Sequence, residues 1–204
     1  MIYDLHTHST FSDGTLTPVE LVDRAIENRV DVLSITDHDC IDACHVDLAA
    51  GKNIQLVHGI ELSTHWENTG IHVLGLDFDP NSPAIRRAAE IQTEARQTRA
   101  QQIAERLEKQ GVSNALEGAA TYAPNSYLGR PHFAQHIVAS GKARNIQAAF
   151  HLYLGSGKAG DVKHHWAELP QVVEWIRAAS GIPVLAHPLK YSLTRSKLKR
   201  LLLA

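Results

Sequence analysis

The sequence predicts an α/β fold around a parallel sheet, and three observations support this class. Short apolar runs of strand character alternate along the chain with longer stretches of helical periodicity, which is the pattern of repeated βα units. A hydrophobic content of 44% and a charged content of 21% are ordinary for a globular protein. With 204 residues, the chain fits one domain and can bury a substantial core.

Five apolar runs are the predicted strands of this sheet. Each is short and contains Ile, Val or Leu, as buried strands do. We expect strands at residues 2–5, 32–35, 54–57, 71–75 and 182–186. Parallel strands present their carboxyl ends at one edge of a sheet, and functional groups gather at that edge.

Helical segments are predicted between these strands. Thr17 followed by Pro18 is a helix start, with threonine as the cap and proline at the first position. The stretch from Ser82 to Gln110 is rich in Ala, Arg, Gln and Glu and ends at a glycine, a typical helix stop. Helical character continues to about Leu154, which we interpret as an insertion. A further helix is expected at residues 169–179.

Charge and cysteine content restrict the functional class. The formal net charge of −2 gives no overall attraction for nucleic acid, so a bound polyanion requires a local basic patch. Cys40 and Cys44 are too few for a disulfide scaffold, and we expect them to be reduced structural residues. The chain starts directly with a strand pattern and has no apolar stretch of about 20 residues. We therefore expect a cytoplasmic protein without membrane association, and no obligate protein partner is indicated.

Histidine is the unusual component of the composition. The chain has 13 histidines, and imidazole is the commonest metal ligand in proteins. The first predicted strand is followed by His6 and His8, whose spacing places both rings on one face of extended chain. Asp13 follows in a turn that can bring its carboxylate back over the same strand end.

Each of the other predicted strands also has a histidine or an acidic residue in it or near its carboxyl end. The candidate ligands are His6, His8, Asp13, His38, Glu61, His72 and His187. Mixed imidazole and carboxylate ligands suit manganese, zinc or iron. Seven candidates exceed the needs of one ion, which favours a site for several metals.

The order and spacing of these motifs resemble those of the PHP (polymerase and histidinol phosphatase) family. The matching segments are residues 4–9 (DLHTHS), 12–14 (SDG), 36–39 (TDHD), 59–61 (GIE), 72–75 (HVLG) and 186–188 (AHP). Later segments, at 129–134, 154–158 and 166–167 with 175–176, are similar to one subgroup of the family. That subgroup contains RNase AM-type 5′-to-3′ exoribonucleases and 3′,5′-nucleoside bisphosphate phosphatases.

The resemblance implies a distorted seven-stranded βα barrel that holds two or three divalent metal ions, with manganese favoured over zinc or iron. The barrel would comprise residues 1–80 and 155–204, and residues 81–154 would form a helical insertion that caps the substrate. The seven candidate residues would be ligands, with Glu61 bridging. A late Asp-x-His ligand pair of the family does not follow His187. Either the sequence lacks the C-terminal part of the barrel, which we favour, or the protein has lost full metal occupancy.

The resemblance also implies the chemistry. A hydroxide that bridges two metal ions would hydrolyse the 3′-phosphate of nucleoside 3′,5′-bisphosphates, with trimming of short RNA from its 5′ end as a second activity. Metal binding lowers the pKa of water from 15.7 toward about 7, so that hydroxide is available at neutral pH. The alternatives are a histidinol-phosphate phosphatase and a non-catalytic, metal-binding PHP domain.

A substrate with a second phosphate needs cations outside the metal cluster. Arg130 is the first candidate because guanidinium binds phosphate in a bidentate manner. Lys158 follows a Gly-Ser-Gly segment that lacks the full pattern of a nucleoside triphosphate loop. Arg99 is a third candidate, although a solvent-facing position on its helix is the alternative. His132 is a candidate for protonating the leaving oxygen, with helix capping as the alternative.

Two features near Lys158 bear on this assignment. Asp161 is a carboxylate that would be unfavourable beside a phosphate pocket, and tyrosine stands at this position in the resembling subgroup. His164 and His165 are adjacent, so that in extended chain their rings point apart and at most one can belong to the site.

Overall fold

The computed structural model describes residues 1–67, 69–124, 126–162 and 166–204. The chain divides into two compact units. Unit 1 comprises Met1–Gln92 and Trp166–Ala204, and unit 2 comprises Thr93–His165. His164 and His165 themselves lie outside the described residues.

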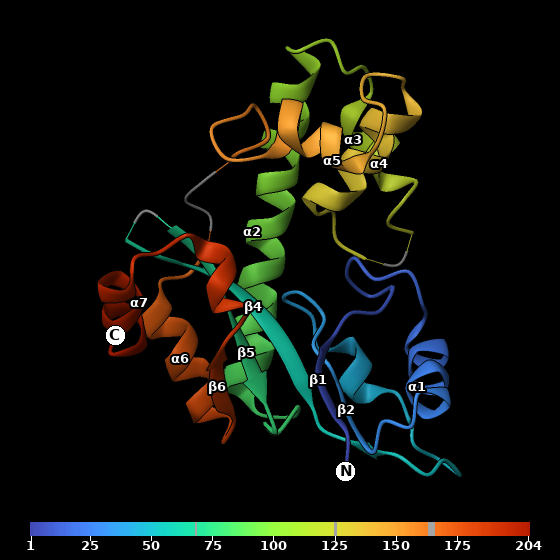
Figure 1. Cartoon of the computed structure of the whole chain (residues 1–204), viewed down its shortest axis with the longest axis vertical. Helices are drawn as coiled ribbons and strands as arrows, with labels where there is room; N and C mark the ends of the chain where they lie inside the picture. Colours follow the sequence, from blue (N-terminus) through green and yellow to red (C-terminus); the bar gives the residue numbers. More distant parts are fainter. Residues whose placement is uncertain (68, 125, 163–165) are drawn as a thin grey trace. The chain divides into compact units, whose positions relative to one another are not determined.

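Unit 1 contains a parallel sheet with the strand order β1-β2-β3. Its strands are β1 (Tyr3–Thr7), β2 (Val32–Ile35) and β3 (Gln55–Leu56). In the register, Leu33 at the centre pairs with Asp4 on one side and Leu56 on the other. Figure 1 shows β1 and β2 side by side. These three strands and their parallel pairing confirm the first part of the prediction.

Helix α1 (Pro18–Glu27) covers this sheet on one side. It begins at the predicted position, where the Thr17 hydroxyl accepts a hydrogen bond from the Glu20 N–H and the Glu20 carboxylate accepts one from the Thr17 N–H. Such a reciprocal cap stabilises the first turn. Val22, on the apolar face of α1, is fully buried in a cluster with Leu33 of the central strand.

The second sheet of unit 1 is antiparallel, which corrects the predicted all-parallel arrangement. Its strands are β4 (Gly59–Trp66), β5 (Thr69–Leu76) and β6 (Ile182–Leu185). Both β4–β5 and β5–β6 pair antiparallel. Trp66 and Thr69 are paired residues, and a connection this short can join only antiparallel strands. The segment Gly59–Trp66, which follows the strand predicted at residues 54–57, is a separate strand that was not predicted.

A backbone bridge connects the two sheets within unit 1. His38 and Glu61 form an isolated parallel bridge beyond the end of β2. The Glu61 N–H donates to the carbonyl of Asp37 over 3.1 Å, and the Asp39 N–H donates to the carbonyl of Glu61 over 3.0 Å. The chain that leaves β2 therefore runs beside β4, which brings polar residues from both sheets together.

Further helices of unit 1 bury the antiparallel sheet. They are η1 (Asp42–His45), α6 (Leu169–Ala178), η3 (Pro188–Tyr191) and α7 (Arg195–Leu202), together with the first part of α2 (Pro83–Glu108). Ile60 and Leu62 of β4 and Ile176 of α6 have no exposed surface in this core.

Unit 2 is helical. It contains the second part of α2 followed by α3 (Ala115–Ala120), α4 (Arg130–Ala139), α5 (Ile146–Ala149) and the π-helical turn η2 (Phe150–Leu154). Its core is built from Leu107, Phe133, Ile137 and Leu154, all with no exposed surface. These helices confirm the helical character predicted for the middle of the chain.

The α/β class is therefore confirmed, but the described residues do not show a seven-stranded barrel. They contain six strands in two three-stranded sheets. Cys40 and Cys44 are both free, as predicted, and burial raises their pKa values to about 12 and about 11. None of the helices in the described ranges combines the length and apolar composition that a membrane crossing requires.

Candidate metal centre

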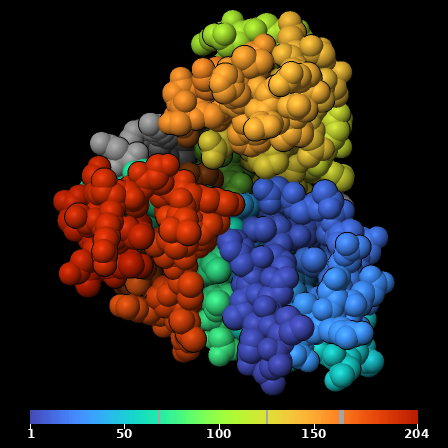
Figure 2. Space-filling model, in the orientation of Figure 1, coloured from blue at the N-terminus to red at the C-terminus, as the bar shows by residue number. Residues whose placement is uncertain are grey.

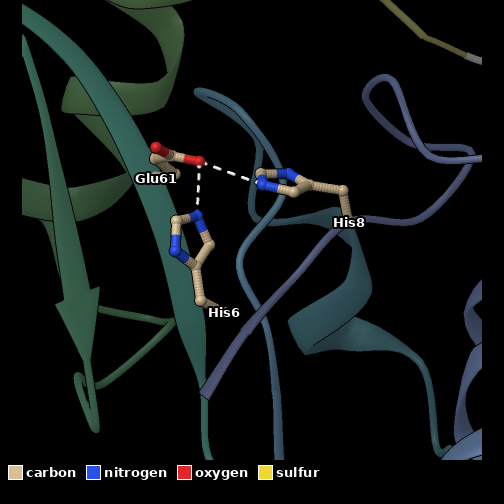
Figure 3. A group of neighbouring side chains, drawn as sticks. All are labelled: His6, His8 and Glu61. Carbon is tan, nitrogen blue, oxygen red and sulfur yellow. Dashed lines mark hydrogen bonds and ion pairs between the residues drawn. The ribbon is translucent and has the colours of Figure 1, made fainter. Parts of the chain in front are cut away.

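Glu61 of β4 is the centre of a cluster of imidazoles in unit 1. Its side chain is 1% exposed. One carboxylate oxygen, Oε2, lies 2.9 Å from His6 Nε2 and 3.0 Å from His8 Nε2, the arrangement drawn in Figure 3. The other oxygen, Oε1, lies 2.8 Å from His72 Nδ1 and 2.9 Å from His187 Nε2. The two oxygens thus face different pairs of histidines.

Strand geometry explains how these side chains meet. His6 and His8 are two residues apart at the end of β1, so that their side chains can point to the same face. On the hairpin, Ser63 is directly opposite His72, and Glu61 is two residues from Ser63. Glu61 and His72 are therefore diagonal neighbours on one face of the antiparallel pair. His187 follows β6, which pairs with β5.

Asp13 and His38 complete the cluster on its other side. His38 Nδ1 lies 3.6 Å from Glu61 Oε2, and His38 Nε2 lies 3.8 Å from Asp13 Oδ2. Asp13 Oδ1 is in turn 3.8 Å from His8 Nδ1. Three groups have ligand atoms close enough together to hold an ion: His6, His8 and Glu61; His8, Asp13 and His38; and His38, Glu61 and His72. The structure therefore brings all seven candidate ligands together.

The turn that holds Asp13 depends on a glycine. Gly14 donates its N–H to the carbonyl of Ser9 over 3.0 Å, which folds the loop after β1 back on itself. A side chain at Gly14 would overlap the carbonyl group of His8. Glycine is therefore required here for the close backbone approach that aims Asp13 at the histidines.

Two buried carboxylates beside His38, those of Asp37 and Asp39, were not predicted from the sequence as functional residues. Asp37 is 1% exposed and accepts hydrogen bonds from the Ser9 N–H (2.7 Å), the Ser9 hydroxyl (2.6 Å) and the Ser12 hydroxyl (2.6 Å). Asp39 is fully buried and accepts from the Ser63 N–H (2.7 Å) and hydroxyl (2.8 Å). The acidic residues on both sides of His38 in the sequence were the available signal.

These two carboxylates are not assigned as metal ligands. Their hydrogen bonds fix the positions of the candidate ligands. Asp37 fastens the loop between His8 and Asp13 to the end of β2. Asp39 fastens the same strand end to β4, two residues from Glu61. Buried carboxylates with several donors hold their partners in one geometry, as outer-shell groups do around metal ligands.

The charges of the cluster shift the pKa values of its members. Burial alone would raise the pKa of Glu61, but the hydrogen bonds from His72 and His8 and the charge of His38 outweigh it and hold that pKa far below its usual range. Burial lowers the pKa of His8, yet the Glu61 carboxylate, with Asp13 and Asp37, raises it above 6.5 overall. Burial lowers the pKa of His187. Glu61 is therefore ionised at neutral pH.

The donor set fits divalent metal ions. Five imidazoles surround a buried, ionised carboxylate with both of its oxygens directed at nitrogen atoms. Nitrogen and oxygen donors in this mixture suit manganese, zinc or iron. A carboxylate with different imidazoles on its two oxygens is suited to bridge two ions.

The candidate substrate residues lie in unit 2. Arg130, the first residue of α4, is half-buried and donates from Nη1 to the carbonyl of Leu154 over 3.3 Å. Burial lowers its pKa, Asp161 raises it and Arg96 lowers it, so these two charges are close to the guanidinium. Arg96 was not predicted as a site residue, although it lies one helical turn from Arg99.

Arg99 is 8% exposed, and its Nε donates to the carbonyl of Val162 over 3.2 Å. The alternative of a solvent-facing position for Arg99 was therefore wrong. Lys158 is exposed in the turn that begins at Gly155. His132 is 3% exposed, and its Nδ1 accepts a hydrogen bond from the Gly129 N–H over 3.0 Å. That contact is the helix cap, the alternative role for this residue.

Comparison with known proteins gives the family. The family model of the PHP domain matches residues 4–181, which include six of the seven candidate ligands. The chain belongs to the PHP domain family. His187, the seventh candidate, lies just beyond the matched range.

Two relatives and one solved structure are similar over nearly the whole chain. The 5′-3′ exoribonuclease Rnm of Escherichia coli K12 is 45% identical over 205 residues, which cover 98% of this chain and 70% of that protein. A 3′,5′-nucleoside bisphosphate phosphatase of Chromobacterium violaceum is 39% identical over 203 residues, 98% of this chain and 71% of that protein. A solved structure described as an amidohydrolase from Chromobacterium violaceum, with bound sulfate and no metal, superposes with a TM-score of 0.93 at 38% identity, over 100% of this chain and 72% of that chain.

Proposed function

We propose that this PHP protein is a metal-dependent phosphoesterase that hydrolyses the 3′-phosphate of nucleoside 3′,5′-bisphosphates and also trims short RNA from its 5′ end. The observation that supports this most is the cluster of five histidines and Asp13 around the buried Glu61 carboxylate. The relatives named for these two activities are 39% and 45% identical over 98% of the chain.

We assign His6, His8, Asp13, His38, Glu61, His72 and His187 as ligands of two or three divalent ions, with manganese as the favoured metal. When bound, such ions lower the pKa of water and neutralise charge on the phosphoryl oxygens. The chain itself supplies an ionised Glu61 that faces histidines from both of its oxygens, and Asp37 and Asp39 keep the strand end of His38 in place.

We assign unit 2 the role of a substrate cap. Arg130, Arg96 and Arg99 provide three guanidinium groups on a helical framework for the phosphate that is not hydrolysed. Lys158 adds an exposed ammonium group. The Asp161 carboxylate raises the pKa of Arg130 against the larger opposing effect of burial, and a bound phosphate would compete with Asp161 for this cation.

We assign His132 to the positioning of Arg130. Its ring accepts the N–H that precedes the first turn of α4, where Arg130 is the first residue. The capping bond therefore orients the guanidinium through the helix start. A proton-donor role would need the ring in contact with the leaving oxygen, and the ring is 3% exposed.

The experiment that tests the proposal is phosphate release from adenosine 3′,5′-bisphosphate with manganese, compared with histidinol phosphate and with metal-free controls. We expect manganese-dependent release from the bisphosphate alone. Phosphate release from histidinol phosphate instead would indicate a histidinol-phosphate phosphatase. If metal binds and neither substrate is hydrolysed, the substrate assignment is wrong and a non-catalytic, metal-binding domain replaces it.

A further inference from the structure

We propose that a concave surface on unit 2, formed by the connection between α4 and α5 and the helical turn that follows, binds the phosphodiester chain of an RNA substrate. This inference rests on the proposed function, because it concerns the part of a strand beyond the nucleotide that is hydrolysed. The concavity has a volume of about 790 Å³. We call it the 141–152 groove, after lining residues that include Lys142, Arg144, Asn145, Gln147, His151 and Leu152.

The charge of the surrounding sequence favours an anion. The chain contains no Asp or Glu from Gly118 to Gly160, while this range includes Arg130, Lys142, Arg144 and Lys158. The whole chain has a formal net charge of −2, so the positive charge is a local property of this segment. A polyanion bound to a nearly neutral protein requires such a local basic surface.

The two cations of the groove are on a well-defined loop. Gly141 has a φ of 72° and ends α4, and the next N–H, that of Lys142, donates back to the last turn of the helix over 3.0 Å. Ala143 is buried between the exposed Lys142 and Arg144. Asn145 then caps α5 with its side chain. Hydrogen bonds to α4 and α5 and the buried Ala143 therefore hold the backbone under both cations, which lowers the entropy cost of binding.

Lys142 and Arg144 are also available for a ligand. Within the described part of the chain, neither side chain forms an ion pair or a hydrogen bond. Each can neutralise one phosphate and release its condensed counterions. In Figure 2 the segment around residues 141–152, coloured yellow to orange, lies at the surface of unit 2.

The remaining lining residues suit single-stranded RNA. His151 is exposed, and a histidine ring can stack on an unpaired base. Leu152 is 53% exposed and offers apolar surface to a base or a ribose. Single-strand sites combine a basic groove along the backbone with rings on which bases stack, and they bind with little sequence preference. An acidic peptide would use the same two cations but has no base that could stack on the ring of His151.

Binding of a fluorescently labelled RNA oligonucleotide, measured by anisotropy in a metal chelator over a range of salt concentrations, tests the inference without catalysis. For single strands, a plot of the logarithm of the binding constant against the logarithm of the salt concentration has a slope of about −0.7 per neutralised phosphate. We expect Lys142→Ala/Arg144→Ala to reduce the salt slope by about 1.4 and to weaken binding roughly 25-fold at 0.1 M salt. The matched control is Lys197→Ala/Lys199→Ala, which removes two exposed cations from α7 and should leave binding unchanged.

Turnover of adenosine 3′,5′-bisphosphate by the same variants separates this inference from the proposed function. We expect the groove variant to retain bisphosphate turnover. Unchanged RNA affinity in that variant, or an equal loss in the α7 control, would overturn the groove assignment. The assignment also fails if a polyglutamate peptide binds the groove as tightly as RNA does. Loss of RNA affinity in a protein that does not hydrolyse the bisphosphate would support the groove and reject the proposed phosphatase.

Discussion

His38 and Glu61 are paired through their backbones, and the same pairing brings their side chains together. The parallel bridge between them places His38 Nδ1 3.6 Å from Glu61 Oε2. The bridge is also the point at which the strand end of the parallel sheet meets the antiparallel sheet. Because the bridge is formed by backbone groups, a side-chain change at either residue acts on the candidate metal centre and leaves the hydrogen bonds of this junction in place.

Glu61→Gln is expected to abolish most metal binding while the chain remains folded. The amide keeps the shape of the side chain but removes the charge that faces the five imidazoles. We expect manganese affinity and phosphate release to fall by more than roughly 100-fold, the upper end of what the loss of an outer-shell partner costs. Calorimetric titration of the metal measures this. Glu174→Gln, at an exposed position on α6, is the control, and equal metal affinity in both variants would contradict the assignment.

Asp37→Asn should weaken metal binding without removing a ligand. The Asp37 carboxylate accepts three hydrogen bonds from Ser9 and Ser12, and an amide nitrogen would face donors instead of accepting from them. We expect a loss of manganese affinity of roughly 10- to 100-fold and a destabilisation of about 1–3 kcal/mol. Metal titration and thermal unfolding measure the two effects. Asp42→Asn changes an exposed carboxylate nearby and should alter neither quantity.

The pKa of His8 should reveal its dependence on Glu61 in the metal-free protein. Burial lowers that pKa and the Glu61 carboxylate raises it, with a net value above 6.5. In Glu61→Gln only the burial and the weaker acidic neighbours remain, so we expect the pKa of His8 to fall. An NMR titration of the imidazole resonances measures this, and an unchanged or higher pKa in the variant would be inconsistent with the observed contacts.

The same shift predicts how metal binding depends on pH. A protonated imidazole cannot bind a metal ion, so protons compete with the metal at His8. Since the pKa of His8 lies above 6.5, metal affinity should begin to fall above pH 6.5 as the solution is acidified. Metal titrations at a series of pH values measure this dependence. Affinity that stays constant from pH 8 down to pH 6 would exclude His8 as a ligand.

Arg130→Ala should weaken the binding of substrates that carry two phosphates. A hydrogen bond to a charged group contributes about 1.5–3 kcal/mol, so we expect the KM for adenosine 3′,5′-bisphosphate to rise roughly 10- to 100-fold. The KM for adenosine 3′-monophosphate should not change. Arg177→Ala, at an exposed position on α6, is the control. An equal rise with both substrates would indicate that Arg130 supports the fold of unit 2 rather than the second phosphate.

Replacement of His132 distinguishes its two candidate roles. Glutamine at this helix position can also accept the N–H before the first turn, whereas alanine cannot. We expect His132→Ala to destabilise the protein by about 0.5–2 kcal/mol and His132→Gln to restore most of that stability. If capping is the role, kcat in His132→Gln falls less than tenfold. A loss of roughly 100-fold or more in that variant would instead indicate proton transfer.

The sequence by itself determined the identity of the candidate ligands and the local elements that present them. His6 and His8 are two residues apart in extended chain, and Thr17 and Pro18 mark a helix start, so both features follow from neighbouring residues. The capping box and the parallel pairing of β1 with β2 agree with what these short-range patterns predict.

Only the tertiary structure decided how the ligands converge and which arginines are buried. Glu61 and His72 meet because β4 and β5 form an antiparallel hairpin, not because their strands end at a common edge. Residue types specify a strand, but its partner and its direction depend on contacts between distant segments. In the same way, the helical spacing of Arg99 is compatible with a solvated face, and its burial depends on the carbonyl of Val162, 63 residues later in the chain.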